Sequence, residues 1–116
     1  MFMMAFAAVF VVQDAPQPDP QAWYWQAGGC AASAAIESEH AGSTLSEAER
    51  SALTAEMIGG GMVMAQMGTD IGRTAEQIDS QDGEAMMSFF SVMREHRREA
   101  FDAHRAYCRV LLARRD

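Results

Sequence analysis

Soft sulfur ligands are abundant in this sequence, because ten of its 116 residues are methionine. Thioether sulfur suits Cu(I), which prefers soft ligands to oxygen. An antiparallel pair of helices would bring Met67 close to Met93 and His96, so these three residues are a candidate copper site. The simpler interpretation is that methionine fills space in a helical core, as we expect for Met57 and Met64.

The three histidines are spaced too widely to share one site. His96 and His104 are eight residues apart, which is about 12 Å along a helix, and His40 ends a different helix. This spacing argues against a zinc site made of histidines and against a Ser-His-Asp arrangement. The sequence also lacks a Cys-x-x-Cys motif and a Gly-x-Ser-x-Gly motif. We therefore predict a protein that is not an enzyme and carries no cofactor.

The two cysteines, Cys30 and Cys108, are predicted to form a disulfide. If three helices run up, down and up, with turns centred near residues 43 and 82, then Cys30 lies level with Glu56. By the same count Glu56 lies level with Cys108. Closing so long a loop would stabilise the fold by about 4 kcal/mol. The alternative is a pair of buried free thiols in a cytosolic protein.

A cluster of three aromatic residues, Trp23, Tyr24 and Trp25, is a candidate contact site for a partner. Aromatic rings that remain partly exposed commonly mark such sites. The alternative is that the rings fill the space left by the three consecutive glycines at residues 59–61.

Arginines are concentrated at the end of the chain. Residues 94–116 carry a net charge of +3, whereas residues 13–93 carry −10. Arg94, Arg97 and Arg98 are therefore candidates for contact with an anionic partner. The alternative is that a basic last helix complements acidic neighbours within its own bundle.

The overall charge limits the classes of partner. Sixteen acidic residues oppose nine basic ones, which gives a formal net charge of −7, and all nine basic residues are arginine. General nucleic-acid binding requires a basic surface, so it is excluded. Chemistry that needs a lysine, such as a Schiff base or a Walker-type phosphate loop, is excluded as well.

The amino-terminal segment predicts export. Residues 1–12 are apolar and uncharged, too short to span a membrane but typical of the apolar part of a signal peptide. We expect residues 1–15 to be a leader, cleaved near residues 12–15, and residues 16–19 to be a proline-rich linker. A periplasmic or secreted location follows. The alternatives are a short membrane-surface anchor or a buried apolar strand.

The remaining residues, 20–116, predict a single all-α domain, an antiparallel three-helix bundle. Asp19 followed by Pro20 is typical of a helix start. Ser46 and Glu49 form a capping box at the start of a second helix. A turn signal, Asp-Gly at residues 82–83, precedes the third. The expected helices cover about residues 20–40, 47–78 and 84–115.

The second helix has a heptad seam and an unusual number of glycines. Each interior glycine costs about 1 kcal/mol relative to alanine, so we expect a kink or break at Gly59, Gly60 and Gly61. Such a break would give four helices instead of three. The seam consists of Leu53, Met57, Gly60, Met64, Met67, Ile71, Thr74 and Ile78, and a second stripe of small residues consists of Gly61, Ala65, Gly68, Gly72 and Ala75.

Taken together, these patterns predict a small exported protein of the cell envelope that acts by binding a partner. The alternative function is periplasmic copper binding through the methionines and histidine named above.

Overall fold

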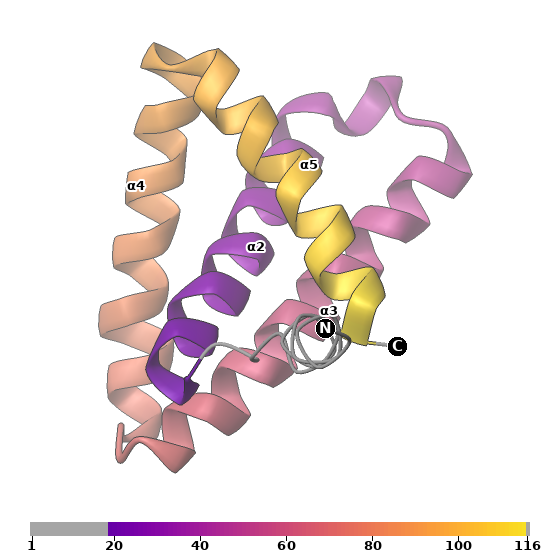
Figure 1. Cartoon of the computed structure of the whole chain (residues 1–116). Helices are drawn as coiled ribbons and strands as arrows, with labels where there is room; N and C mark the ends of the chain where they lie inside the picture. The colour runs from indigo at the N-terminus through magenta and orange to yellow at the C-terminus, as the bar shows by residue number, and fades with distance from the viewer. Residues whose placement is uncertain (1–18, 116) are drawn as a thin grey trace, which may run out of the picture.

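The computed structural model describes the backbone of residues 19–115 and the side chains of residues 19–111. These residues form an all-α bundle without strands (Figure 1). The predicted leader and most of the linker lie outside the described residues. The helices are α2 (Pro20–Ala41), α3 (Glu47–Asp70), α4 (Gly83–His96) and α5 (Arg98–Arg115), with a 3₁₀ turn at Gly42–Thr44 and a π-helical segment at Gln77–Asp82.

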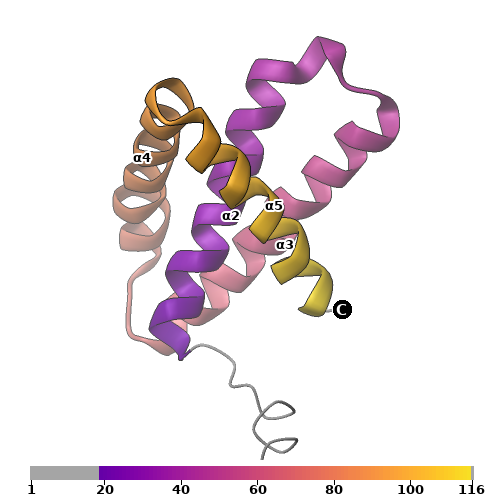
Figure 2. The same ribbon diagram turned by 45° about the horizontal axis from the view of Figure 1, so that its top comes forward.

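Helix α2 is the central element, because each of the other three helices packs against it. The view in Figure 1 shows it between α4 and α3, and Figure 2 shows α5 crossing over it. Its start is fixed as predicted, since the Asp19 side chain accepts a hydrogen bond of 2.8 Å from the backbone N–H of Ala22, and Pro20 follows. The helix ends within one residue of the predicted boundary.

Small residues let the neighbouring helices approach α2 closely. A Cβ atom added to Gly28 would lie 2.5 Å from the sulfur of Met86 on α4, and one added to Gly60 of α3 would lie 2.8 Å from the carbonyl oxygen of Ala27. Both contacts are shorter than van der Waals packing allows. At residue 60 the obstacle is the backbone of α2, so only glycine fits there, whereas a side chain at residue 28 would require methionine side chains to move. The buried core around these contacts includes Tyr24, Ile36, Val63, Met64, Ile78, Met86, Phe90 and Phe101.

Helix α3 continues through its three glycines, so the predicted break at residues 59–61 is wrong. Gly60 is buried against the backbone of α2, and this close packing offsets its low helix propensity. The helix starts with the predicted capping box, in which Ser46 and Glu49 exchange hydrogen bonds. The first part of the predicted seam is confirmed, since Leu53, Gly60 and Met64 are buried. The second stripe is mostly exposed, apart from Gly68.

The turn predicted at residues 82–83 is also wrong. Helix α3 ends at Asp70, and Gly72, with a φ of 86°, makes the turn in a conformation that favours glycine. Asp82 and Gly83 are helical, and the Asp82 side chain is buried. The polar partners of Asp82 inside the protein explain why this Asp-Gly pair does not mark a turn.

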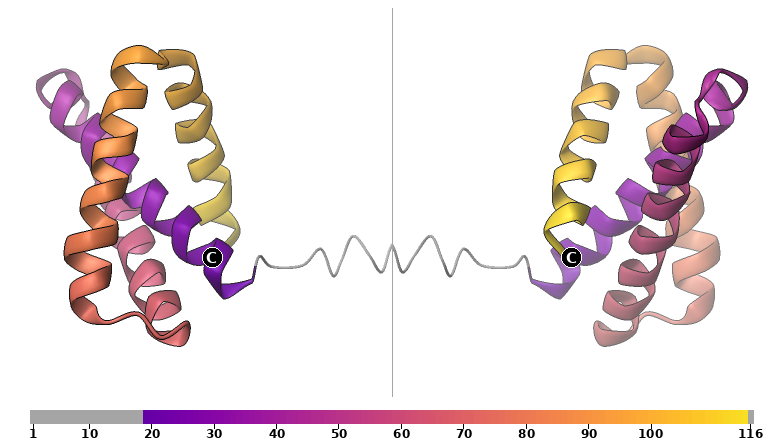
Figure 3. Two further views of the ribbon diagram at one scale, coloured as in Figure 1. Left: turned by 90° about the vertical axis from the view of Figure 1, so that its left-hand side faces the viewer. Right: turned by 90° about the vertical axis from the view of Figure 1, so that its right-hand side faces the viewer.

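The predicted third helix is divided into α4 and α5 at Arg97, whose backbone angles are −137° and 62°. Figure 3 shows α4 and α5 lying side by side as a second hairpin. Within residues 19–115 the all-α bundle is therefore confirmed with four helices, and the extra break falls in the last predicted helix instead of the second. This reversal returns α5 to α2 and allows the predicted disulfide between Cys30 and Cys108, whose Cα atoms are 5.5 Å apart.

Among the described residues, no helix combines the length and hydrophobicity needed to cross a membrane.

The glycines of α3 give a matched test of this packing. Gly59→Ala is expected to stabilise the fold by about 1 kcal/mol, because a new Cβ meets no atom within 4 Å and alanine favours the helix. Gly60→Ala is expected to destabilise it by about 1–3 kcal/mol, because its Cβ would clash with α2. Chemical denaturation of both variants measures the difference, and equal effects would contradict the close contact.

Candidate functional site

The three aromatic residues of the predicted contact site do not share one face. Successive residues on an α-helix point about 100° apart, so Tyr24 faces the core and is fully buried, whereas Trp25 is 44% exposed. Trp23 is half-buried and packs against the core. Tyr24 is therefore corrected from a contact residue to a core residue. The alternative role as a plug over residues 59–61 is also contradicted, because Gly60 is covered by Ala27 and Ala31.

Tyr24 belongs to a buried polar network that ties α2 to the chain before α4. Its hydroxyl donates a hydrogen bond to Oδ2 of Asp82. Arg73 donates to the same oxygen through Nη2 at 2.7 Å and Nε at 2.9 Å. Burial raises the pKa of Tyr24 to about 12, and the hydrogen bond to Asp82 adds to this effect. The network pairs the Tyr24 hydroxyl and the partly exposed Arg73 guanidinium with the buried Asp82 carboxylate.

Trp25 lines an open hollow of about 540 Å³ at the start of α2. The indole ring packs edge-on against Tyr24, with 5.2 Å between ring centroids, which fixes its orientation. Among the described residues of the lining, the ionisable side chain is that of Asp19, which already caps the helix. An apolar side chain from another molecule would fit this surface. The described residues that line it are Asp19, Pro20, Gln21, Ala22, Trp25 and Ile71.

The three arginines proposed for partner binding gather around the junction of α4 and α5. Arg97 and Arg98 are exposed and Arg94 is half-buried. Arg98 forms an exposed ion pair with Asp102 at 3.1 Å. Trp25 lies near the start of α2, whereas Arg94 borders a small hollow next to His40 near its end. The two surfaces are therefore separated by about 22 Å along α2.

The structure does not bring together the residues of the predicted copper site. Met67 lies in the last turn of α3, whereas Met93 and His96 lie in the last turn of α4. Those two helix ends are at opposite ends of the bundle (Figure 1). Both methionines pack against the core, and the His96 side chain is 69% exposed. The prediction failed because the preceding turn lies about ten residues earlier than expected.

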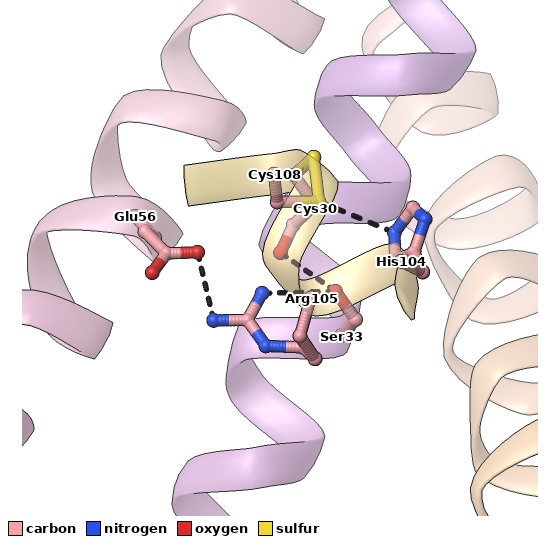
Figure 4. A network of polar contacts seen from close by, with 6 residues as sticks. All are labelled: Cys30, Ser33, Glu56, His104, Arg105 and Cys108. Atoms are coloured by element: carbon pink, nitrogen blue, oxygen red, sulfur yellow. Dashed lines mark hydrogen bonds and ion pairs between the residues drawn. A yellow bond between two sulfur atoms is a disulfide. The ribbon is translucent and has the colours of Figure 1, made fainter. Parts of the chain in front are cut away.

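A polar cluster surrounds the disulfide where α5 crosses α2 and α3 (Figure 4). Arg105 is only 2% exposed. Its Nη2 donates to Oε1 of Glu56 at 2.8 Å, and its Nη1 donates to the hydroxyl of Ser33 at 3.2 Å. The Ser33 hydroxyl in turn donates to the carbonyl oxygen of Cys30. One arginine of the basic segment therefore complements an acidic residue inside the bundle.

His104 joins this cluster on the other side of the disulfide. Its Nε2 atom lies 3.3 Å from Sγ of Cys108, and its ring stacks on Phe90 with centroids 4.4 Å apart. Burial lowers the pKa of His104, and a hydrogen bond to the backbone of Gly29 opposes this shift. Sequence analysis missed this grouping. The four-residue spacing of His104 and Cys108, which places them on one helix face, was the available signal.

Comparison with known proteins found no matching family model, no matching curated protein and no matching solved structure.

The buried hydroxyl of Tyr24 predicts a specific alkaline titration. The difference in phenolate absorbance between the wild type and Tyr24→Phe isolates this residue, and its midpoint is expected near pH 12 instead of the ordinary 10.0. Because the folded state raises this pKa, the resulting stability is present below pH 10 and is lost as the pH rises towards 12.

The free energy of unfolding of the wild type should therefore fall over that range, and that of Tyr24→Phe should not fall for this reason. Circular dichroism at each pH serves as the control that the helices persist. A phenolate midpoint near 10 in the folded protein would contradict the buried network.

Proposed function

We propose that this protein is a non-enzymatic binding module of the cell envelope, which holds an apolar segment of a protein partner against Trp25. The observation that carries the proposal is the hollow at the start of α2, where an exposed indole, a proline and an isoleucine line one surface. Exposed aromatic residues with a fixed orientation are frequent anchors of protein interfaces.

The shape of the hollow favours a protein partner over a small metabolite. Sites for small molecules enclose most of the ligand surface and place several polar groups around it. The hollow is open, and the carboxylate of Asp19 is occupied by the backbone of its own helix. The larger polar clusters, around Asp82 and Arg105, are internal and serve to join helices. This distribution supports binding by shape and apolar contact instead of catalysis.

Export to the periplasm or the outside of the cell is part of the same proposal. The apolar segment of residues 1–12 supports it, as does the disulfide, because disulfides persist mainly in oxidising compartments. The arginines at the junction of α4 and α5 offer a second, basic surface for an anionic envelope component.

A photo-reactive residue tests the hollow directly. With p-benzoyl-phenylalanine at position 21, which lines the hollow, illumination of expressing cells should give one discrete adduct with an envelope protein. Adding Trp25→Ala should reduce this adduct at least about tenfold, since an aromatic anchor is commonly worth 1.4 kcal/mol or more. Electrophoresis and mass spectrometry measure the yield.

Phe89→Ala is the matched control, because Phe89 is 59% exposed on α4 and does not line the hollow. It should leave the adduct unchanged. The proposed site is rejected if Trp25→Ala leaves the yield intact, if both variants lower it equally, or if Trp25→Ala unfolds the protein by circular dichroism.

Intact mass tests the location. Protein expressed from the full sequence should be recovered from the periplasm or the medium. It should lack a leader ending between residues 12 and 15 and should be two hydrogen masses lighter than the reduced chain. A full-length, fully reduced mass would reject export.

A further inference from the structure

Three side chains with metal-binding atoms converge at the crossing of α2 and α5. Sγ of Cys30, Sγ of Cys108 and a ring nitrogen of His104 all lie within 4.8 Å of one another. Cys30 belongs to α2, and the other two residues occupy one face of α5 (Figure 4). In the oxidised protein the two sulfur atoms are bonded to each other, so this grouping becomes a set of three ligands only after reduction.

The distances suit a tetrahedral zinc ion. Zinc binds thiolate sulfur at about 2.3 Å and imidazole nitrogen at about 2.0 Å, which places a sulfur and a nitrogen ligand roughly 3.5 Å apart. The observed separation of His104 Nε2 from Cys108 Sγ is 3.3 Å. The Cα atoms of Cys30 and Cys108, 5.5 Å apart, keep both thiolates within reach of one ion.

The surroundings hold these ligands in place. The ring of His104 stacks on Phe90, and the backbone of Gly29 hydrogen-bonds it. Partners of this kind orient a ligating histidine. Trp23 and Leu111 pack against the two cysteines. The site is thus enclosed by side chains that belong to the folded bundle.

We propose that the reduced form of this protein binds one Zn²⁺ through Cys30, Cys108 and His104, with water as the fourth ligand. The charge balance favours zinc over Cu(I). Two thiolates, a neutral imidazole and Zn²⁺ sum to zero, and the adjacent Arg105 is already balanced by Glu56. Cu(I) would leave a net negative charge in a buried site, which is costly.

The chemistry is balanced as follows. A trialkylphosphine reductant takes the disulfide to two thiols, with two electrons and two protons added to the protein, and becomes the phosphine oxide with oxygen from water. The two thiols then lose two protons as Zn²⁺ binds. Formation of the disulfide and binding of zinc are mutually exclusive, because both use the same sulfur atoms. This inference does not depend on the proposed partner or location.

Metal titration of the full chain tests the proposal. Protein reduced with a trialkylphosphine under argon should bind one equivalent of Zn²⁺ in competition with a chromophoric chelator, and the oxidised protein should bind none. Co²⁺ in place of zinc should give the visible spectrum of a tetrahedral site with thiolate ligands. Circular dichroism recorded during the titration shows whether the helices are present as metal binds.

Two histidine variants separate this site from general thiol binding. His104→Ala keeps both thiols and should lower the zinc affinity at least about tenfold, because even indirect partners of a ligand contribute that much. His96→Ala removes an exposed histidine on α4 and should leave the affinity unchanged. Absence of zinc binding by the reduced chain, or equal affinities for the two variants, would overturn the proposal.

Discussion

Helix α2 is packed against the three other helices, and this central position constrains every neighbouring element. Its buried stretch is built from alanine, glycine, serine and cysteine around Tyr24 and Ile36. The backbone of α3 comes so close that residue 60 has no room for a side chain, and the sulfur of Met86 occupies the space beside Gly28. Larger residues would push the helices apart. The small residues in the buried stretch of α2, together with Gly60 of α3, are therefore a requirement of packing.

The position of α5 depends on a different kind of contact. Its buried side includes the guanidinium of Arg105, which is stable there because Glu56 and Ser33 accept its hydrogen bonds. The disulfide lies one turn further along the same helix. The disulfide and the ion pair of Arg105 thus hold α5 at the point where it crosses α2 and α3. The apolar surface at Trp25 is left uncovered at the start of α2.

The helical content, the starts of α2 and α3 and the cysteine pair could be predicted from the sequence. The helix starts depend on capping residues next to them in the chain, and the pairing needs only the number of cysteines. The turns were not predictable in the same way. The Asp-Gly at residues 82–83 is a strong turn signal, but Tyr24 and Arg73 hold Asp82 inside the protein. The count that placed Cys30 level with Cys108 set the second turn about ten residues too late and had no reversal at Arg97, and these two errors partly offset each other. The exposure of Trp25 is compatible with the aromatic contact hypothesis. The burial of Tyr24 and the separation of Met67 from Met93 and His96 depend on long-range packing, which local patterns do not specify.

The separation of 78 residues between Cys30 and Cys108 also sets an order of events during biosynthesis. The residues of α2 and α3 are synthesised before Cys108, so any structure that the first hairpin adopts at that stage forms without the disulfide. The first cysteine meanwhile has no partner in the chain. Closure consequently requires that the chain has been synthesised through α5 as far as Cys108.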